Sequence, residues 1–101
     1  MTEELPDSTE ELVVEAVRKA AEKTNPALVR VLEVHLKETT GMGLDVAYRD
    51  ADAFIESVKK LFGEYGARFF ELAIIGEIRD TFGIATAADT LRDVVRELKG
   101  M

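Results

Sequence analysis

The chain has 101 residues, of which 47% are hydrophobic, and it carries a formal net charge of −7. This size and composition fit one domain with a hydrophobic core and exclude wholesale disorder. The acidic balance argues against nucleic acid and against an anionic membrane surface as partners, because both are bound mainly through Lys and Arg.

Several kinds of chemistry are excluded by residue types that the chain lacks. It has no cysteine, which removes disulfides, thiolate metal sites and cysteine nucleophiles. His35 is the single histidine, so zinc sites that need two histidines cannot form. We therefore expect no metal and no cofactor. No apolar run reaches the roughly 20 residues that span a bilayer, and the acidic N-terminus has no secretory pattern, so we expect a cytoplasmic protein.

The first predicted helix follows residues 1–7, which we expect to be a flexible acidic tail. It begins at Asp7 or Ser8, and Ser8 with Glu11 has the spacing of a capping box. It ends near Lys23. Its valines and alanines fall on one face at about 100° per residue and its charges on the other, which is typical of a helix packed on a core.

Asn25 and Pro26 separate the first helix from the second. Helix is disfavoured before proline, while asparagine as N-cap and proline at the first helical position start a new helix. This second helix is expected to run to about Glu38. Its apolar arc is wide, so we expect it to contact neighbours on two sides.

Residues 39–50 form the longest stretch without helical periodicity. Two glycines break the helix, and Leu44, Val46 and Tyr48 then alternate as in an extended segment. One short strand cannot form a sheet, so we expect an ordered loop that contains at most a β-bridge. Asp50 is then the expected N-cap of a third helix that Gly63 ends.

Two more helices complete the prediction. The fourth runs from about Glu64 to Thr81, and the fifth, capped by Thr86, covers residues 87–99. Five helices on short connectors predict an all-α fold, a compact bundle that forms a single domain over residues 8–101.

The fourth helix is apolar on nearly every side. Plotted at about 100° per residue, Phe69, Leu72 and Gly76 form one apolar sector. A second sector contains Phe70 and Ile74 together with residues further along the helix. Such a helix is normally surrounded by protein, and a glycine inside a helix usually marks the close approach of another backbone. That backbone is either the second helix or the same helix of a second copy.

We predict that the surplus apolar surface of this helix forms a homodimer or partner-protein interface. The residues expected in it are Phe70, Ile74, Ile75, Gly76, Ile78 and Phe82. The leading hypothesis is thus a non-enzymatic interaction module.

A small-molecule sensor is the alternative hypothesis. Its pocket would lie between residues 26–38 and 64–81, with His35 and Tyr48 as polar anchors. A third hypothesis, an enzyme that uses His35 as base with Thr39 or Glu38, lacks an orienting group at recognisable spacing. A lone histidine in an apolar arc is most often a packing residue with one hydrogen bond. The chain also contains no glutamine and one asparagine, a depletion that favours a thermophilic source.

The order of features from Leu28 to Ile78 resembles a small helical output domain of archaeal signalling and regulatory proteins. A His-Leu helix leads into a glycine-containing loop, an Asp-capped helix ends in Leu-Phe-Gly, and a Gly-Ala turn starts a long apolar helix ending in Glu-Ile. The matching positions are His35-Leu36, Gly41 to Leu44, Asp52 to Phe54, Leu61 to Gly63, Gly66-Ala67, Glu71 and Glu77-Ile78.

The resemblance implies an archaeal cytoplasmic protein that acts by protein–protein contact. It brings no catalytic residue to this chain. The predicted fifth helix and the lack of an attached sensor or DNA-binding domain depart from the family's pattern.

Overall fold

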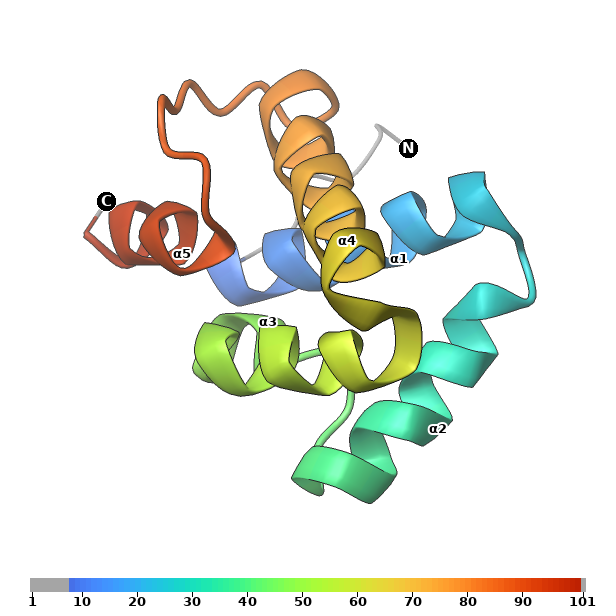
Figure 1. Ribbon diagram of the computed structural model, residues 1–101. Coiled ribbons are helices and arrows are strands. Elements are labelled where there is room, and N and C mark those ends of the chain that lie inside the picture. Colours follow the sequence, from blue (N-terminus) through green and yellow to red (C-terminus); the bar gives the residue numbers. More distant parts are fainter. Residues whose placement is uncertain (1–7, 101) are drawn as a thin grey trace, which may run out of the picture.

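Five helices make up the computed structural model, which describes residues 8–100 (Figure 1). No strand occurs in this part of the chain, so the all-α prediction is confirmed. The expected tail over residues 1–7 lies outside the described residues. The helices are α1 (Thr9–Thr24), α2 (Leu28–Thr40), α3 (Val46–Arg49), α4 (Ala51–Asp80) and α5 (Leu91–Lys99).

Helix α1 begins as its sequence predicts. The hydroxyl of Ser8 accepts a hydrogen bond from the backbone N–H of Glu11 at 3.1 Å and caps the helix. The alternative start at Asp7 lies outside the described residues. The face of α1 that carries its valines and alanines is buried, and the buried residues are Val13, Ala16, Val17, Ala20 and Ala21.

Helix α2 begins and ends slightly later than expected. The side chain of Asn25 accepts a hydrogen bond from the N–H of Ala27 at 2.9 Å, and regular helix begins at Leu28. The helix continues past Glu38 to Thr40 and ends at Gly41, whose φ of 79° is the left-handed conformation that favours glycine.

The segment expected to be extended forms the short helix α3 instead. The carboxylate of Asp45 accepts the N–H of Gly43 at 3.1 Å, and the N–H of Val46 donates to the carbonyl of Gly43, which starts a helical turn. Val46 and Ala47 are then both buried. Over so few residues, alternation does not distinguish a strand from one turn of helix, and burial of adjacent residues decides for the helix.

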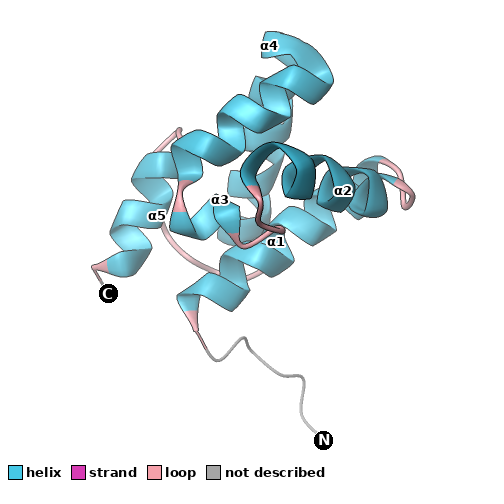
Figure 2. Ribbon diagram, turned by 90° about the horizontal axis from the view of Figure 1, so that it is seen from below, coloured by secondary structure: helices cyan, strands magenta, loops and turns pink. Residues whose placement is uncertain are grey.

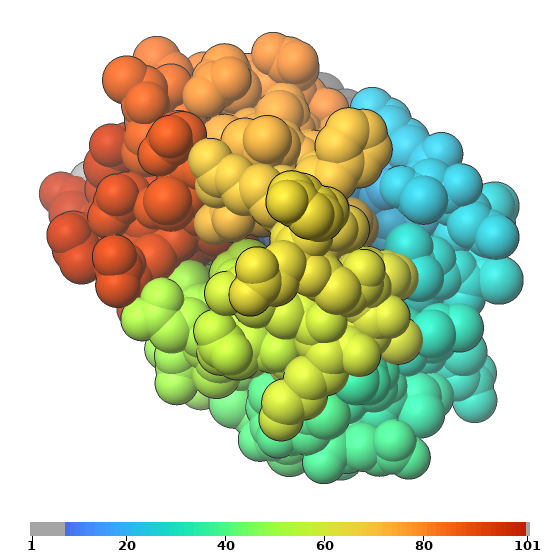
Figure 3. All heavy atoms as spheres, viewed as in Figure 1, coloured from blue at the N-terminus to red at the C-terminus, as the bar shows by residue number. Residues whose placement is uncertain are grey.

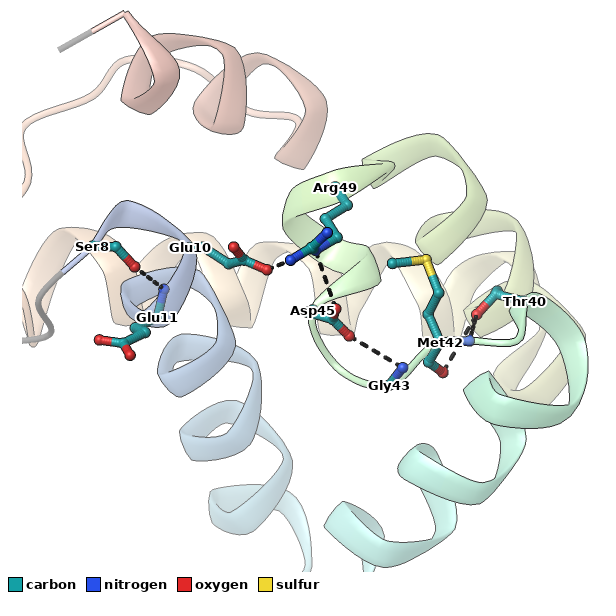
Figure 4. Close-up of polar contacts among 8 residues, drawn as sticks. All are labelled: Ser8, Glu10, Glu11, Thr40, Met42, Gly43, Asp45 and Arg49. Carbon is teal, nitrogen blue, oxygen red and sulfur yellow. Dashed lines mark hydrogen bonds and ion pairs between the residues drawn. The ribbon is translucent and has the colours of Figure 1, made fainter.

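An arginine fastens α3 to α1, as Figure 4 shows. The Nε atom of Arg49 lies 2.8 Å from a carboxylate oxygen of Glu10 on α1 and 3.2 Å from one of Asp45. The hydrogen bond to Glu10 is the main reason why the pKa of Arg49 lies above its ordinary value. This cation therefore has a structural role between two helices.

Helix α4 contains a sharp bend at Gly63, which is visible in Figure 1. Asp50 caps the start of the helix through the N–H of Ala53, as expected. The two helices predicted on either side of Gly63 exist, but they meet without a loop. Gly63 has φ 81° and ψ 173°, a conformation that is essentially restricted to glycine. We call residues 51–62 and 64–80 the first and second halves of α4.

Helix α5 begins later than expected. It starts at Leu91 with Thr90 as N-cap, because the hydroxyl of Thr90 accepts the N–H of Asp93. Thr86, the expected cap, instead donates its hydroxyl hydrogen bond to Glu97 on α5. Residues 81–90 connect α4 to α5 without helix.

The core is built on α4, which contacts each of the other four helices. Figure 2 shows α4 beside α5, with α1, α2 and α3 gathered against it. The largest fully buried side chains come from every helix of the described chain and include Val17, Leu32, Leu36, Phe54, Ile74, Ile78 and Leu91. Within residues 8–100, no helix has the length and apolar character that crossing a membrane requires.

Candidate interaction surface

The second half of α4 has one apolar face in the core. Phe70, Ile74, Ile75 and Ile78 are all at most 5% exposed. They pack with α1 and α5 in a single cluster of buried residues. Side chains buried in the folded chain cannot contact a second molecule, so these four expected interface residues belong to the core. Phe82 is half-buried and packs against the same cluster.

The opposite face of the same helix is also apolar, but it is open to solvent. Tyr65 is 94% exposed, Phe69 78% and Leu72 45%. Together with Gly76 they follow one line along the helix, and we call these four residues the α4 stripe. In Figure 3 the second half of α4, coloured yellow to orange, reaches the surface between α5 and the blue and cyan residues of α1 and α2.

Gly76 continues the α4 stripe without contacting a neighbour. A Cβ atom built on Gly76 would meet nothing within 4 Å among the described residues. The second helix therefore does not approach this glycine closely, so the first of the two expected neighbours of Gly76 is excluded. Of the predicted interface residues, Gly76 is the one that lies on the exposed apolar face.

Charged residues lie beside and at the ends of the α4 stripe. Arg68 is held by Glu71 at 3.0 Å and by the carbonyl oxygen of Asp89 at 2.6 Å. Glu64, near the start of the stripe, and Arg79, near its end, are both exposed. Neither forms an ion pair or hydrogen bond with another side chain in residues 8–100. The stripe is thus a neutral surface with an unpaired charge of opposite sign at each end.

Two buried carboxylates fix the orientation of this helix. Glu71 accepts the backbone N–H of Leu91 at 2.7 Å, at the N-terminus of α5, in addition to its contact with Arg68. The first N–H groups of a helix lack intrahelical partners and favour negative charge, so this contact joins α4 to α5.

Glu77 joins α4 to the end of α1. It forms an ion pair with Lys23 and accepts the hydroxyl hydrogen bond of Thr81 at 2.7 Å. Burial raises the pKa of the Glu77 carboxyl, but the hydrogen bonds from Lys23 and Thr81 and the charges of Lys23 and Lys19 outweigh it. The pKa of Glu77 therefore lies below its ordinary value, and the carboxylate is charged near neutral pH.

His35 is a packing residue between α2 and the first half of α4. Its Nε2 atom lies 2.7 Å from the carbonyl oxygen of Ser57. A carbonyl oxygen only accepts, so Nε2 carries the hydrogen. The hydroxyl of Thr39 donates to the backbone carbonyl of His35 at 2.9 Å and also contacts the hydroxyl of Ser57.

Tyr48 has different neighbours from His35. Its hydroxyl is 2.9 Å from that of Thr9 on α1, and Lys99 of α5 lies 4.9 Å from the centre of its ring. Tyr48 lines a hollow of ≈ 230 Å³. Within the described chain, the other residues that line this hollow belong to α3, α4 and α5, and none belongs to α2. The expected pair of polar anchors therefore does not share this hollow. No group of three or more His, Asp or Glu side chains within residues 8–100 could hold a metal ion.

Residues 7–100 match the family model described as NitrOD5, Nitrosopumilus output domain 5. The chain belongs to this family. The resemblance to an archaeal output domain is thus confirmed, and the NitrOD5 match extends beyond residues 28–78 to nearly the whole chain.

A solved structure supports the same fold for this NitrOD5 chain. The crystal structure of PH0832 from Pyrococcus horikoshii OT3 is similar to it with a TM-score of 0.85 and 35% sequence identity. The similarity covers 90% of this chain and 93% of PH0832. Among curated proteins, no sequence matches the chain.

Proposed function

We propose that this NitrOD5 chain is a non-enzymatic, cytoplasmic interaction module of archaeal regulation, and that it forms a homodimer through the α4 stripe. The observation that carries this proposal is the exposure of Tyr65 and Phe69 directly opposite the buried face of the same helix. Aromatic side chains are enriched at protein interfaces, where their large apolar area is removed from water.

The exposed area suggests an interface of modest strength. An aromatic side chain buries roughly 150–250 Å² when covered, so Tyr65 and Phe69 together offer about 350 Å². A standard interface buries about 800 Å² on each partner. The two rings thus supply almost half of that area, and Leu72 with its surroundings adds more. We therefore expect a dimer of modest strength that dissociates into single chains on dilution.

The polar contacts around His35 support a role without catalysis. Its Nε2 hydrogen is engaged by the backbone of Ser57, and the hydroxyl of Thr39 is bonded to backbone and to another hydroxyl. A base–nucleophile pair would need the imidazole and this hydroxyl to be bonded to each other. The regulatory role itself is supported by the description of the family as an output domain.

The experiment that tests the proposal is the solution mass by light scattering over a dilution series. We expect twice 11.2 kDa at high concentration and a decrease towards the single-chain mass on dilution. Phe69→Ser should weaken the dimer and so shift the midpoint of its dissociation to a higher protein concentration. Val34→Ser is the matched control, because Val34 is an exposed apolar residue on α2, 46% accessible, outside the α4 stripe. A single-chain mass at about 100 μM, above the dissociation constant of most specific interfaces, would contradict the homodimer.

We also propose a thermophilic source, from the absence of glutamine and the single Asn25. Thermal unfolding followed by circular dichroism tests it. Mesophilic domains unfold mostly between about 45 and 65 °C, and a midpoint in that range would contradict the proposal.

A further inference from the structure

We infer that two copies of this chain pair antiparallel along the α4 stripe, so that Tyr65 of each copy lies over Gly76 of the other. The inference rests on the homodimer proposed above and specifies its geometry. A two-fold axis would pass between Phe69 and Leu72.

The spacing of the α4 stripe reads the same in both directions. Its members are separated by four, three and four residues. At about 100° per residue they stay within a sector of about 60° on the helix surface. A second copy running in the opposite direction therefore places Phe69 opposite Leu72 and Tyr65 opposite Gly76 with no change of register. Self-complementarity of this kind is what a two-fold interface requires.

The sizes of the side chains favour the same orientation. Tyr65 is almost fully exposed, whereas Gly76 has open space where its Cβ would be. In the antiparallel pair the large ring at one end of the stripe covers the bare backbone at the other end. A parallel pair would instead place two tyrosine rings together and two glycines together, which gives a clash at one end and a gap at the other.

The charges near the ends of the α4 stripe also favour the antiparallel orientation. Glu64 and Arg79 lie near opposite ends of the stripe, and neither has a side-chain partner in the described part of its own chain. Antiparallel pairing brings Glu64 near Arg79 of the partner subunit at both ends of the interface. A parallel pair would bring like charges together. Between the two ends, the stripe itself is uncharged, so two chains of net charge −7 can approach there.

Disulfide cross-linking tests the orientation, because the chain has no cysteine of its own. Tyr65→Cys and Gly76→Cys chains are mixed and oxidised, and mass spectrometry separates mixed from identical pairs. Antiparallel pairing predicts the mixed pair. Two copies of Gly76→Cys should not cross-link, because the two positions would lie ~16 Å apart along the helices. A disulfide needs Cα atoms within about 7 Å.

The outcomes separate the orientation from the dimer. Each variant is first checked by light scattering. If wild type and variants are all monomeric, the proposed homodimer fails, and the orientation fails with it. If they are dimeric but Gly76→Cys cross-links to itself, or the mixed pair does not form, the orientation fails and the homodimer stands.

A charge exchange gives an independent readout without oxidation. Glu64→Arg should weaken the dimer several-fold, since it places two cations near each other at both ends. The double variant Glu64→Arg with Arg79→Glu should restore the wild-type dissociation midpoint. If the double variant is as weak as the single one, the two residues do not face each other and the antiparallel orientation is wrong.

Discussion

The two faces of the second half of α4 contain the same kinds of residue in opposite surroundings. One face holds Phe70 and three isoleucines, all at most 5% exposed, and the other holds Tyr65, Phe69 and Leu72, between 45% and 94% exposed. In residue type the faces differ mainly in their aromatic content. An apolar helix in a small domain can therefore have one face that builds the core and another that stays open to solvent.

The largest expected difference comes from placing the same charge on each face. Ile75→Glu puts an unpaired carboxylate in the core and should cost more than about 4 kcal/mol, which unfolds the chain. Phe69→Glu should leave the monomer folded and abolish the dimer. Circular dichroism and light scattering on both variants measure this. If Phe69→Glu also unfolds the chain, the two faces are not distinct.

A smaller loss is expected from the buried carboxylate that joins α4 to α5. Glu71→Ala removes the acceptor for Leu91 N–H and the partner of Arg68, and hydrogen bonds to charged groups are worth about 1.5–3 kcal/mol. Glu64→Ala, an exposed glutamate on the same helix, should change stability by less than about 0.5 kcal/mol. Urea denaturation at dilute, monomeric concentrations compares them. Equal losses would mean that Glu71 does not hold the two helices together.

Two glycine substitutions in α4 should change the stability of the monomer in opposite directions. Gly76→Ala should stabilise the monomer by about 0.5–1 kcal/mol, because its Cβ meets open space and alanine favours helix. The same methyl group should weaken the dimer. The control Gly66→Ala should destabilise the monomer, since its Cβ would lie 2.8 Å from that of Phe62. A Gly76→Ala chain that dimerises more tightly would contradict the packing of Tyr65 over this position.

The smallest expected effect is the pH dependence of the contact between α1 and α4. The pKa of Glu77 is lower in the folded chain than its ordinary value of 4.5. Its charged form therefore adds stability above about pH 4.5, and this contribution is lost as the pH falls through the lower, folded pKa. Lys23→Met should reduce stability at pH 7 and have progressively less effect below pH 4.5. Urea midpoints across this range measure it. Lys60→Met, at an exposed lysine that forms no ion pair or side-chain hydrogen bond within residues 8–100, should show no such trend.

The presence of most helices, and the positions at which most of them start, could be predicted from local signals in the sequence. Ser8, Asn25 and Asp50 each accept a backbone N–H close to the predicted start of a helix. The start of α5 did not follow, because Thr86 and Thr90 both have the chemistry of an N-cap. The helix starts after Thr90, where the backbone N–H of Leu91 donates a hydrogen bond to Glu71, a residue far away in the sequence. Contacts between residues far apart in the chain have no local signature.

The exposed face of α4 was present in the sequence as the sector of Phe69, Leu72 and Gly76. The sequence did not show which of two apolar sectors faces inward, because that depends on how α1 and α5 pack. Phe70, Ile74 and Ile78 of the other sector were expected in the interface, whereas they fill the core. Tyr65 was missed, although its position four residues before Phe69 places it in the same sector.

The bend at Gly63 also determines where in the chain an inserted residue can be tolerated. Since the two halves of α4 meet with no loop between them, one residue inserted after Gly63 would turn the second half by about 100° about its own axis. The isoleucines would rotate out of the core and the tyrosine and phenylalanine towards its edge. An insertion within residues 81–90 would merely lengthen a connector. Natural variants of this domain should therefore differ in length in the connector and keep the count of residues across the bend.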